Sequence, residues 1–244
     1  MQKYFISTKN LNECIIDKDD AFHISTVMRN KIGDEIIVSD ELKTYLAKIK
    51  SLSNNLVNFE VVEEIKTDNE LPVKITIFQG YPKGDKLDDI IKHSTELGAY
   101  EFFLTIMKRS LFKLDLKKKE AKLERFQKIA KEAAEQSYRR IIPKVKDIIE
   151  LKKINFDEYD KLILCYEESS KNGDLCNFKS IIKSLNKNEK VAVLIGPEGG
   201  IDESELKYLL NIGFIPCGLG PRILRTETAA SYVLSSISYE MELK

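Results

Sequence analysis

From residue 73 onward, short apolar runs alternate with segments of helical periodicity, and this alternation constrains the fold more than any other feature of the chain. The apolar runs are VKITIF, YEFFLTIM, KLILCY, VAVLI and FIPCGLG, which begin at residues 73, 100, 161, 191 and 214. The helical segments lie at residues 86–97, 117–138, 202–210 and 227–243. Strands that alternate with helices are typical of a parallel sheet with crossover helices. The sequence therefore predicts an α/β domain here.

The chain before residue 66 carries a different pattern, in which short strands dominate. In LVNFEVVEE, Val57, Phe59 and Val61 alternate with polar residues, as expected of a half-buried strand. The segments EIIVSD and TYLAKIK are similar, and only residues 23–29 look helical. We expect a small β-barrel over residues 1–68, joined by the polar segment KTDNELP at 66–72 to the α/β domain over 72–244.

Composition restricts the class of protein. The chain has 244 residues, of which 43% are hydrophobic and 32% charged, as in globular proteins. No window approaches the roughly 18 apolar residues that cross a bilayer, and the opening MQKYFISTKN lacks a basic start followed by an apolar stretch. We therefore expect a cytoplasmic protein without membrane contact. The cysteines lack C-x-x-C spacing and the two histidines are isolated, so we expect no disulfide and no metal.

The charges are unevenly distributed, although the formal net charge is zero. Residues 108–146 contain 14 Lys and Arg against five Asp and Glu, so the rest of the chain carries the opposite excess. A basic stretch on an otherwise acidic protein is consistent with a nucleic-acid interface. It is equally consistent with a solvated helix face.

The segment LIGPEGG, at residues 194–200, contains a proline and three glycines directly after an apolar run. Glycine lets a ligand approach the backbone closely, and proline stiffens the loop. Asp202 is expected to cap the following helix, with Glu205 completing a capping box. Open α/β sheets bind ligands beyond the carboxyl ends of their strands. The loop is therefore a predicted ligand-binding site.

A second loop, GLGPRILRT at residues 218–226, repeats this arrangement on what we expect to be a neighbouring strand. Thr226 is the predicted N-cap of the last helix, and Glu227 would lie at the positive end of its dipole. Neither loop matches G-x-G-x-x-G or a P-loop, which disfavours a nucleotide-phosphate site. Two such loops suit a neutral or cationic ligand held by backbone groups.

With these motifs the chain resembles the RsmE family of 16S rRNA uridine-N3 methyltransferases, within the SPOUT superfamily. The resemblance covers essentially the whole length. It rests on His23 to Asp34, KGDK at 83–86, TELG at 95–98, Arg109-Ser110, EAAEQS at 132–137, LIGPEGG and LGPRILRTETAA at 219–230. The chain departs from many relatives at Lys92-His93 and at Tyr138, outside the two loops.

The resemblance implies a PUA-like β-barrel that binds RNA and a SPOUT α/β domain with a deep C-terminal trefoil knot. It implies S-adenosyl-L-methionine as the cofactor, a homodimer, and 16S rRNA of the small ribosomal subunit as the partner. The implied reaction is methylation of N3 of a specific uridine.

The site residues follow from mapping this resemblance onto the motifs. We expect Glu227 to take the N3 proton, with Glu198 as the alternative base, and Arg222 and Arg225 to orient the uracil. A helix-capping role for Glu227, or inter-subunit ion pairs for the arginines, would be the structural alternative. The expected cofactor-binding residues are Leu194, Ile195, Gly196, Pro197, Glu198, Gly199, Gly200, Leu219, Gly220, Ile223, Leu224, Arg225, Thr226 and Ala229. The expected RNA-binding residues are Lys3, Arg29, Lys83, Arg109, Gln136 and Arg139.

Two other functions compete with this one. A non-catalytic RNA-binding or ribosome-assembly protein would keep the fold without turnover, but the intact loop motifs argue against it. Methylation of a ribose 2′-oxygen is the alternative within the superfamily.

The basic stretch generates a prediction about RNA binding. Each phosphate neutralised on a single strand contributes a slope of about −0.7 in log K against log salt, so we expect affinity to fall steeply as salt rises. Titration of labelled 16S rRNA across a salt series measures this slope. An affinity that does not change with salt concentration would indicate that the basic helix is not part of the RNA interface.

Overall fold

The computed structural model describes residues 1–66, 69–111, 116–171 and 176–243, which form two compact units. Unit 1 comprises Met1–Glu70 together with Ala134–Ile142, and unit 2 comprises Leu71–Ala133 together with Pro143–Lys244. The expected linker at 66–72 includes residues 67 and 68, which lie outside the described residues. The sequence did not predict that residues 134–142 pack with the N-terminal unit.

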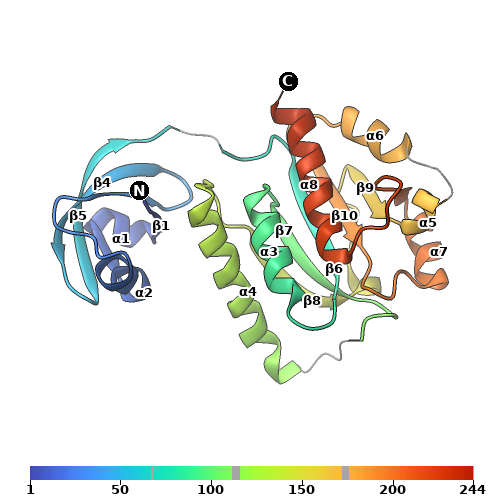
Figure 1. Cartoon of the computed structure of the whole chain (residues 1–244), viewed down its shortest axis with the longest axis horizontal. Coiled ribbons are helices and arrows are strands. Elements are labelled where there is room, and N and C mark those ends of the chain that lie inside the picture. The colour runs from blue at the N-terminus through green and yellow to red at the C-terminus, as the bar shows by residue number, and fades with distance from the viewer. Residues whose placement is uncertain (67–68, 112–115, 172–175, 244) are drawn as a thin grey trace. The chain divides into compact units, whose positions relative to one another are not determined.

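Unit 1 is built on a curled five-stranded sheet with the order β1-β3-β4-β5-β2 (Figure 1). Its strands are β1 (Lys3–Phe5), β2 (Ile15–Asp17), β3 (Glu35–Ser39), β4 (Thr44–Leu52) and β5 (Leu56–Glu64). Its helices are α1 (Thr8–Glu13), α2 (Lys18–Phe22) and a π-helix (His23–Val27). β1 pairs with β3 in parallel, and the other pairs are antiparallel. The helix expected at 23–29 is confirmed in part, whereas α1 was missed.

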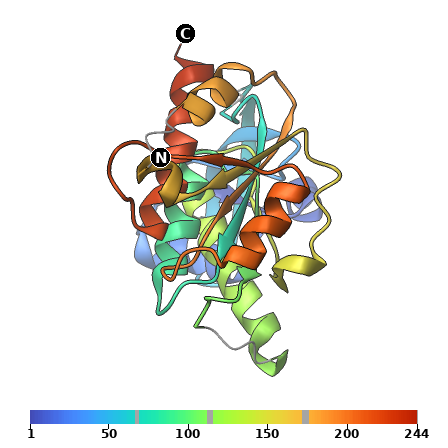
Figure 2. The ribbon, with the colours of Figure 1, turned by 90° about the vertical axis from the view of Figure 1, so that its right-hand side faces the viewer.

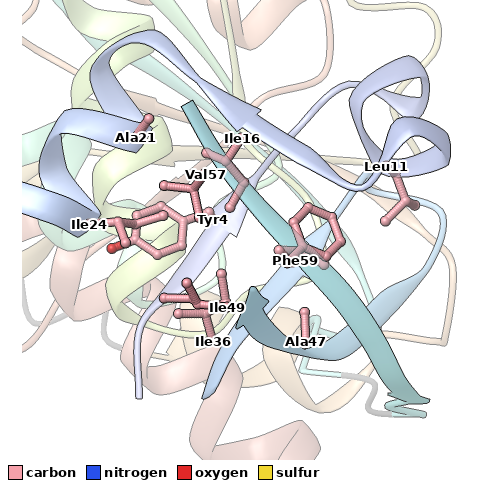
Figure 3. Close-up of a cluster of buried hydrophobic side chains, with 11 residues drawn as sticks. Tyr4, Leu11, Ile16, Ala21, Ile24, Ile36, Ala47, Ile49, Val57 and Phe59 are labelled. Atoms are coloured by element: carbon pink, nitrogen blue, oxygen red, sulfur yellow. The ribbon is translucent and has the colours of Figure 1, made fainter. Parts of the chain in front are cut away.

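The core of unit 1 gathers side chains from all five strands and the short helices (Figure 3). Val57 and Phe59 of β5 point into it, as their spacing predicts. Val61, the next residue of the predicted alternation, is instead 42% exposed. It lies in the last part of β5, where all residues from Glu60 to Glu64 are exposed. The other members are Tyr4, Leu11, Ile16, Ala21, Ile24, Ile36, Val38, Ala47 and Ile49.

Residues 134–142 bring a buried ion pair into unit 1. Arg139 is 2% exposed and forms an ion pair with Glu70. Glu70 Oε1 also accepts hydrogen bonds from the backbone amides of Arg140 and Ile141, at 2.9 and 3.2 Å. The Lys3 ammonium is 5% exposed and donates to the carbonyl oxygen of Arg139. This network fixes the segment against the N-terminal residues.

Unit 2 contains a six-stranded sheet with the order β11-β9-β10-β6-β7-β8, and all of its pairs are parallel. Its strands are β6 (Lys74–Gly80), β7 (Glu101–Ile106), β8 (Lys144–Glu150), β9 (Lys161–Cys165), β10 (Lys190–Ile195) and β11 (Ile215–Cys217). The predicted parallel sheet is confirmed, although β8 was missed. β9 separates β10 from β11, so the expectation that the two glycine-proline loops follow neighbouring strands is wrong.

Helices cover both faces of this sheet (Figure 2). They are α3 (Lys86–Glu96), α4 (Leu116–Gln136), α5 (Glu167–Lys171), α6 (Cys176–Lys183), α7 (Glu203–Asn211) and α8 (Thr226–Glu242), with a 3-10 turn at Leu151–Lys153. Leu209 of α7 packs with Phe78, Leu164 and Leu194 on one face. α3 and α8 pack against each other on the opposite face. This two-sided cover explains why the central strands are apolar on both faces.

The Glu70 network generates a stability prediction. Glu70→Gln should lower the free energy of unfolding of unit 1 by about 3 kcal/mol, because it removes a carboxylate charge that pairs with the buried Arg139. Glu60→Gln is the matched control, since Glu60 pairs with Lys50 at 3.1 Å on the surface, where such pairs contribute about 0.5 kcal/mol. Hydrogen exchange of the β1 and β4 amides in urea measures both. Equal effects of the two substitutions would contradict a structural role for the buried pair.

Candidate functional site

The carboxyl ends of β6, β9, β10 and β11 meet at one edge of the parallel sheet, and the loops that follow them lie together. The contact between the end of β6 and the loop after β10 is unusually close. A Cβ atom at Gly80 would lie 2.6 Å from the backbone nitrogen of Pro197 and 2.9 Å from the carbonyl carbon of Gly196. Real Cβ atoms do not approach backbone so closely, so only glycine fits at position 80.

A buried glutamine connects three segments at this edge. Gln79 is fully buried, and its Nε2 donates to Thr226 Oγ1 at 2.8 Å and to the Gly80 carbonyl at 3.0 Å. Thr226 Oγ1 in turn donates to the Gly196 carbonyl at 2.7 Å. The end of β6, the loop after β10 and the start of α8 are thereby held together.

This network corrects the role predicted for Thr226. The N-cap residue of α8 is Arg225, whose side chain makes no capping hydrogen bond, and Thr226 is the first helical residue. The Thr226 hydroxyl bonds to another loop instead of to its own helix. Glu227 does lie in the first turn of α8, as expected.

Asp202 caps α7 as predicted, because its carboxylate accepts from the Ser204 amide at 3.0 Å. Hydrogen bonds from the Ser204 hydroxyl and amide, and from Lys108, hold the pKa of Asp202 at about 2. The Glu205 carboxylate does not complete a capping box. It is 4% exposed and accepts from the Lys108 amide at 2.8 Å, so it ties the loop after β7 to α7.

The loops surround a cavity of about 520 Å³. Most of the expected cofactor residues line it, namely Ile195, Gly196, Pro197, Glu198, Gly200, Leu219, Ile223, Leu224, Arg225, Thr226 and Ala229. Leu194 is fully buried in the core on one face of the sheet, and Gly199 and Gly220 are not among the lining residues. The two glycine-proline loops therefore share one cavity even though β9 lies between their strands.

The strand between them contributes residues that the sequence analysis missed. Cys165, Tyr166, Glu167 and Glu168, at the end of β9 and the start of α5, line the cavity. The sequence did contain a signal for these residues, because two glutamates follow the run LILCY directly, at the carboxyl end of a predicted strand. Its importance depended on strand order, which the sequence does not give.

Lys86 was also missed and lies at the centre of the charged side of the cavity. Its Nζ is 2.9 Å from Glu198 Oε1 and 3.4 Å from Glu227 Oε2. The Lys83 backbone amide donates to both oxygens of Glu198, at 3.1 and 3.2 Å. One lysine thus links carboxylates from the loop after β10 and from α8. Only its place in KGDK could have drawn attention to it.

These contacts keep the Lys86–Glu198 pair charged. The hydrogen bond to Glu198 raises the pKa of the Lys86 ammonium. Partial burial raises the pKa of Glu198, but the hydrogen bonds from Lys86 and from the Lys83 amide outweigh it and leave the pKa below its ordinary value. At neutral pH, Lys86 is therefore an ammonium ion in contact with the Glu198 carboxylate.

The predicted catalytic residues are only partly gathered around the cavity. Arg222 and Arg225 are exposed and line it. Glu227 is not among the lining residues but contacts Lys86, whereas Glu198, the alternative base, does line the cavity.

Two of the expected RNA-binding residues are placed differently from their prediction. Lys3 and Arg139 are buried in unit 1, where their charges are used in the Glu70 network, so they offer no exposed charge to a phosphate. Exposed positions are occupied by Arg29, Lys83, Arg109 and Gln136.

Four of the cations in the basic stretch at 108–146 form ion pairs within unit 2. Lys108 contacts Asp202, Lys119 contacts Asp147, Arg125 contacts Asp88, and Lys146 contacts Glu101. Residues 112–115 of the stretch lie outside the described residues. The pairing reduces the number of cations that this stretch can offer to RNA.

Within residues 1–66, 69–111, 116–171 and 176–243, no group of three or more His, Cys, Asp or Glu is placed to hold a metal ion. In the same ranges no helix has the length and apolarity required of a membrane span.

Comparison with protein families gives two matches. The model of an RNA methyltransferase domain matches residues 69–238, and that of an RNA methyltransferase PUA domain matches residues 16–62. The first match contains the whole cavity, and the second lies within unit 1.

Individual relatives match over nearly the full length. The chain is 44% identical to Ribosomal RNA small subunit methyltransferase E of Bacillus subtilis, with coverage of 100% of this chain and 98% of the relative. The crystal structure of Ribosomal RNA small subunit methyltransferase E from Neisseria gonorrhoeae bound to S-adenosyl methionine has a TM-score of 0.81 at 29% identity, with coverage of 98% and 97%. The crystal structure of a hypothetical protein has a TM-score of 0.89 at 42% identity, with coverage of 99% of both chains. With an RNA methyltransferase model matched over most of its length, the chain belongs to the ribosomal RNA small subunit methyltransferase E family.

Proposed function

We propose that this protein transfers a methyl group from S-adenosyl-L-methionine to N3 of a specific uridine in 16S rRNA of the small ribosomal subunit. The observation that carries the proposal is the cavity built from the two glycine-proline loops, in a chain 44% identical over its whole length to a small subunit methyltransferase E. The Neisseria gonorrhoeae relative, bound to S-adenosyl methionine, supports the choice of cofactor.

The lining of the cavity fits this cofactor. Its volume of about 520 Å³ lies in the range of small-molecule sites. Ile195, Leu219 and Leu224 supply apolar surface for an adenine ring, and the glycine backbone leaves room for hydrogen bonds to its edge. Glu167, Glu168 and Glu203 supply negative charge for an ammonium, a sulfonium or ribose hydroxyls, while Arg222 and Arg225 supply positive charge for a carboxylate. The remaining proposed contacts are those predicted from the loop motifs.

The bound cofactor would supply an electrophilic methyl group on a sulfonium. The protein must then hold the uracil in line with that group and remove the proton from N3. Arg222 and Arg225 can orient the uracil carbonyls or a flanking phosphate from the cavity rim. Of the two carboxylates, the geometry favours Glu198 as the proton acceptor, since it faces the cavity. Glu227, which the sequence favoured, contacts Lys86 and is not among the lining residues.

The proposal extends to the assembly of the enzyme. Unit 1 would close into a PUA-like barrel that binds RNA, and the segment from β11 to α8 would form the trefoil knot of a SPOUT domain. The domain limits would be 1–68 and 72–244, and the protein would act as a cytoplasmic homodimer. The PUA family match at residues 16–62 and the hydrogen bonds that join Thr226 to Gly196 and Gln79 support this arrangement.

A binding and transfer experiment tests the proposed function. We expect calorimetric titration to detect saturable binding of S-adenosyl-L-methionine. Labelled cofactor should transfer methyl to small subunits that lack the modification, and parallel assays with free 16S rRNA identify the form of the substrate. Absence of cofactor binding would favour a non-catalytic RNA-binding or assembly protein. Resistance of the product to alkaline cleavage at the modified position would indicate ribose 2′-O methylation instead.

A comparison of two carboxylate variants tests the assignment of the base. Glu198→Gln should lower kcat by about 100-fold, because it removes the proton acceptor that faces the cavity. Glu227→Gln should lower kcat less and leave cofactor affinity nearly unchanged, since Glu227 contacts Lys86 from outside the cavity. Steady-state methyl transfer and calorimetry measure both quantities. A larger loss of kcat for Glu227→Gln than for Glu198→Gln would instead identify Glu227 as the base.

A further inference from the structure

A second hollow, of about 550 Å³, adjoins the cavity described above. Lys86, Arg109 and Glu198 line both spaces and therefore form the boundary between them. The second hollow is completed by Lys83, Gly84, Leu111 and Gly199. A group bound in it would meet a ligand of the first cavity across these three charged side chains.

The two cations at the boundary are held at the loop that carries Glu198. Lys86 Nζ contacts Glu198 Oε1 at 2.9 Å. Arg109 Nη1 donates to the carbonyl oxygen of Gly199, the next residue of the loop, at 3.1 Å. A Cβ atom at Gly199 would lie 3.1 Å from Arg109 Cβ, so the arginine packs directly against the loop. The Glu198 carboxylate is therefore in contact with one cation, Lys86, while a second cation, Arg109, is held against the next residue of the same loop.

This arrangement complements one pyrimidine edge. Uracil presents a carbonyl oxygen, the N3–H donor and a second carbonyl oxygen in a row, which matches the donors and acceptor of Lys86, Glu198 and Arg109. Cytosine presents an amino group and an unprotonated N3, which would place a lone pair against the carboxylate. Proteins read single-stranded RNA through such edges of unstacked bases.

We propose that the second hollow binds the target uracil, with Glu198 accepting from N3 and with Lys86 and Arg109 donating to its two carbonyl oxygens, which leaves Arg222 and Arg225 to contact a flanking phosphate. This inference rests on the proposed function and assigns to that reaction a substrate pocket and a specificity mechanism. Leu111, which is 76% exposed, gives the hollow an apolar surface for the base. Among the described residues, no atom outside Gly84 and its chain neighbours lies within 4 Å of a Cβ built at Gly84, so no side chain crowds this part of the lining.

Lys86 has a further role in the chemical step. An ammonium has three N–H donors, and Lys86 Nζ lies 2.9 Å from Glu198 Oε1 and 3.4 Å from Glu227 Oε2. When the ammonium turns to a uracil oxygen, it stabilises negative charge on the base and loosens its hold on Glu198. The N3 proton passes to the Glu198 carboxylate. The N3 lone pair then forms the new N–C bond to the methyl carbon, while the C–S electron pair remains on sulfur.

Lys86→Met, Lys86→Arg and the control Lys92→Met test this proposal. Lys92 is an exposed lysine on the same helix and takes no part in the site. The substrates are unmodified small subunits with uridine or cytidine at the target position. Calorimetry with S-adenosyl-L-methionine reports on the first cavity, and kcat is measured as a function of pH. The charged groups that face Lys86 are Glu198, Glu227 and, across the hollow, Arg109 and Lys83.

We expect Lys86→Met to lower kcat by about 100-fold while cofactor affinity is unchanged, as for loss of one donor to a developing anion. The rise of kcat with pH should move upward by about one unit, because N3 must ionise without the nearby cation. Lys86→Arg should restore much of the rate, and Lys92→Met should match the wild type. Glu198→Gln should narrow the preference for uridine over cytidine.

Three results would overturn the proposal while leaving the proposed function intact. The first is a wild-type rate and pH profile in Lys86→Met. The second is a loss of cofactor affinity equal to the loss of rate, which would place Lys86 in the cofactor site. The third is an unchanged uridine preference in Glu198→Gln. If the wild-type protein neither binds the cofactor nor methylates RNA, the proposed function itself fails.

Discussion

The buried amide of Gln79 is the interaction on which the site depends. Its hydrogen bond to Thr226, and that of Thr226 to the Gly196 carbonyl, join three segments that lie far apart in the sequence. A buried polar side chain without partners would cost about 1–3 kcal/mol, so these groups favour the arrangement in which they meet. The missing side chain of Gly80 allows the loop after β10 to approach β6 at this point. The shape of the cavity follows from these contacts.

The cavity combines apolar walls with nearly balanced charge. Among the described residues, four cations and four carboxylates line it, and several of them contact one another or the backbone. Fixed charges of both signs suit ligands that are themselves zwitterionic, because each end of such a ligand finds a partner. They also keep the site from attracting any single type of ion strongly. The long-range attraction of RNA must therefore come from other parts of the surface.

Local patterns predicted much of this architecture. The alternation of apolar runs and helical segments predicted the parallel sheet, because each strand buried on both faces is apolar throughout. The loop at 196–200 was identified as part of a site because the effects of glycine, of proline and of the end of a strand on the backbone can be inferred from neighbouring residues alone. Asp202 as a helix cap was predictable for the same reason.

Features that depend on long-range packing were not predictable. Strand order is set by tertiary contacts, so nothing in the sequence revealed that β9 separates β10 from β11 or that Glu167 and Glu168 reach the cavity. Lys3 and Arg139 look like exposed cations until the segment that carries Arg139 packs with unit 1. The same packing has an evolutionary consequence. The chain passes between the two units after residues 70, 133 and 142, so no single cut releases a complete N-terminal unit. Gene fusion or domain shuffling would separate Glu70 from Arg139, and such an interleaved pair is expected to be inherited as a whole.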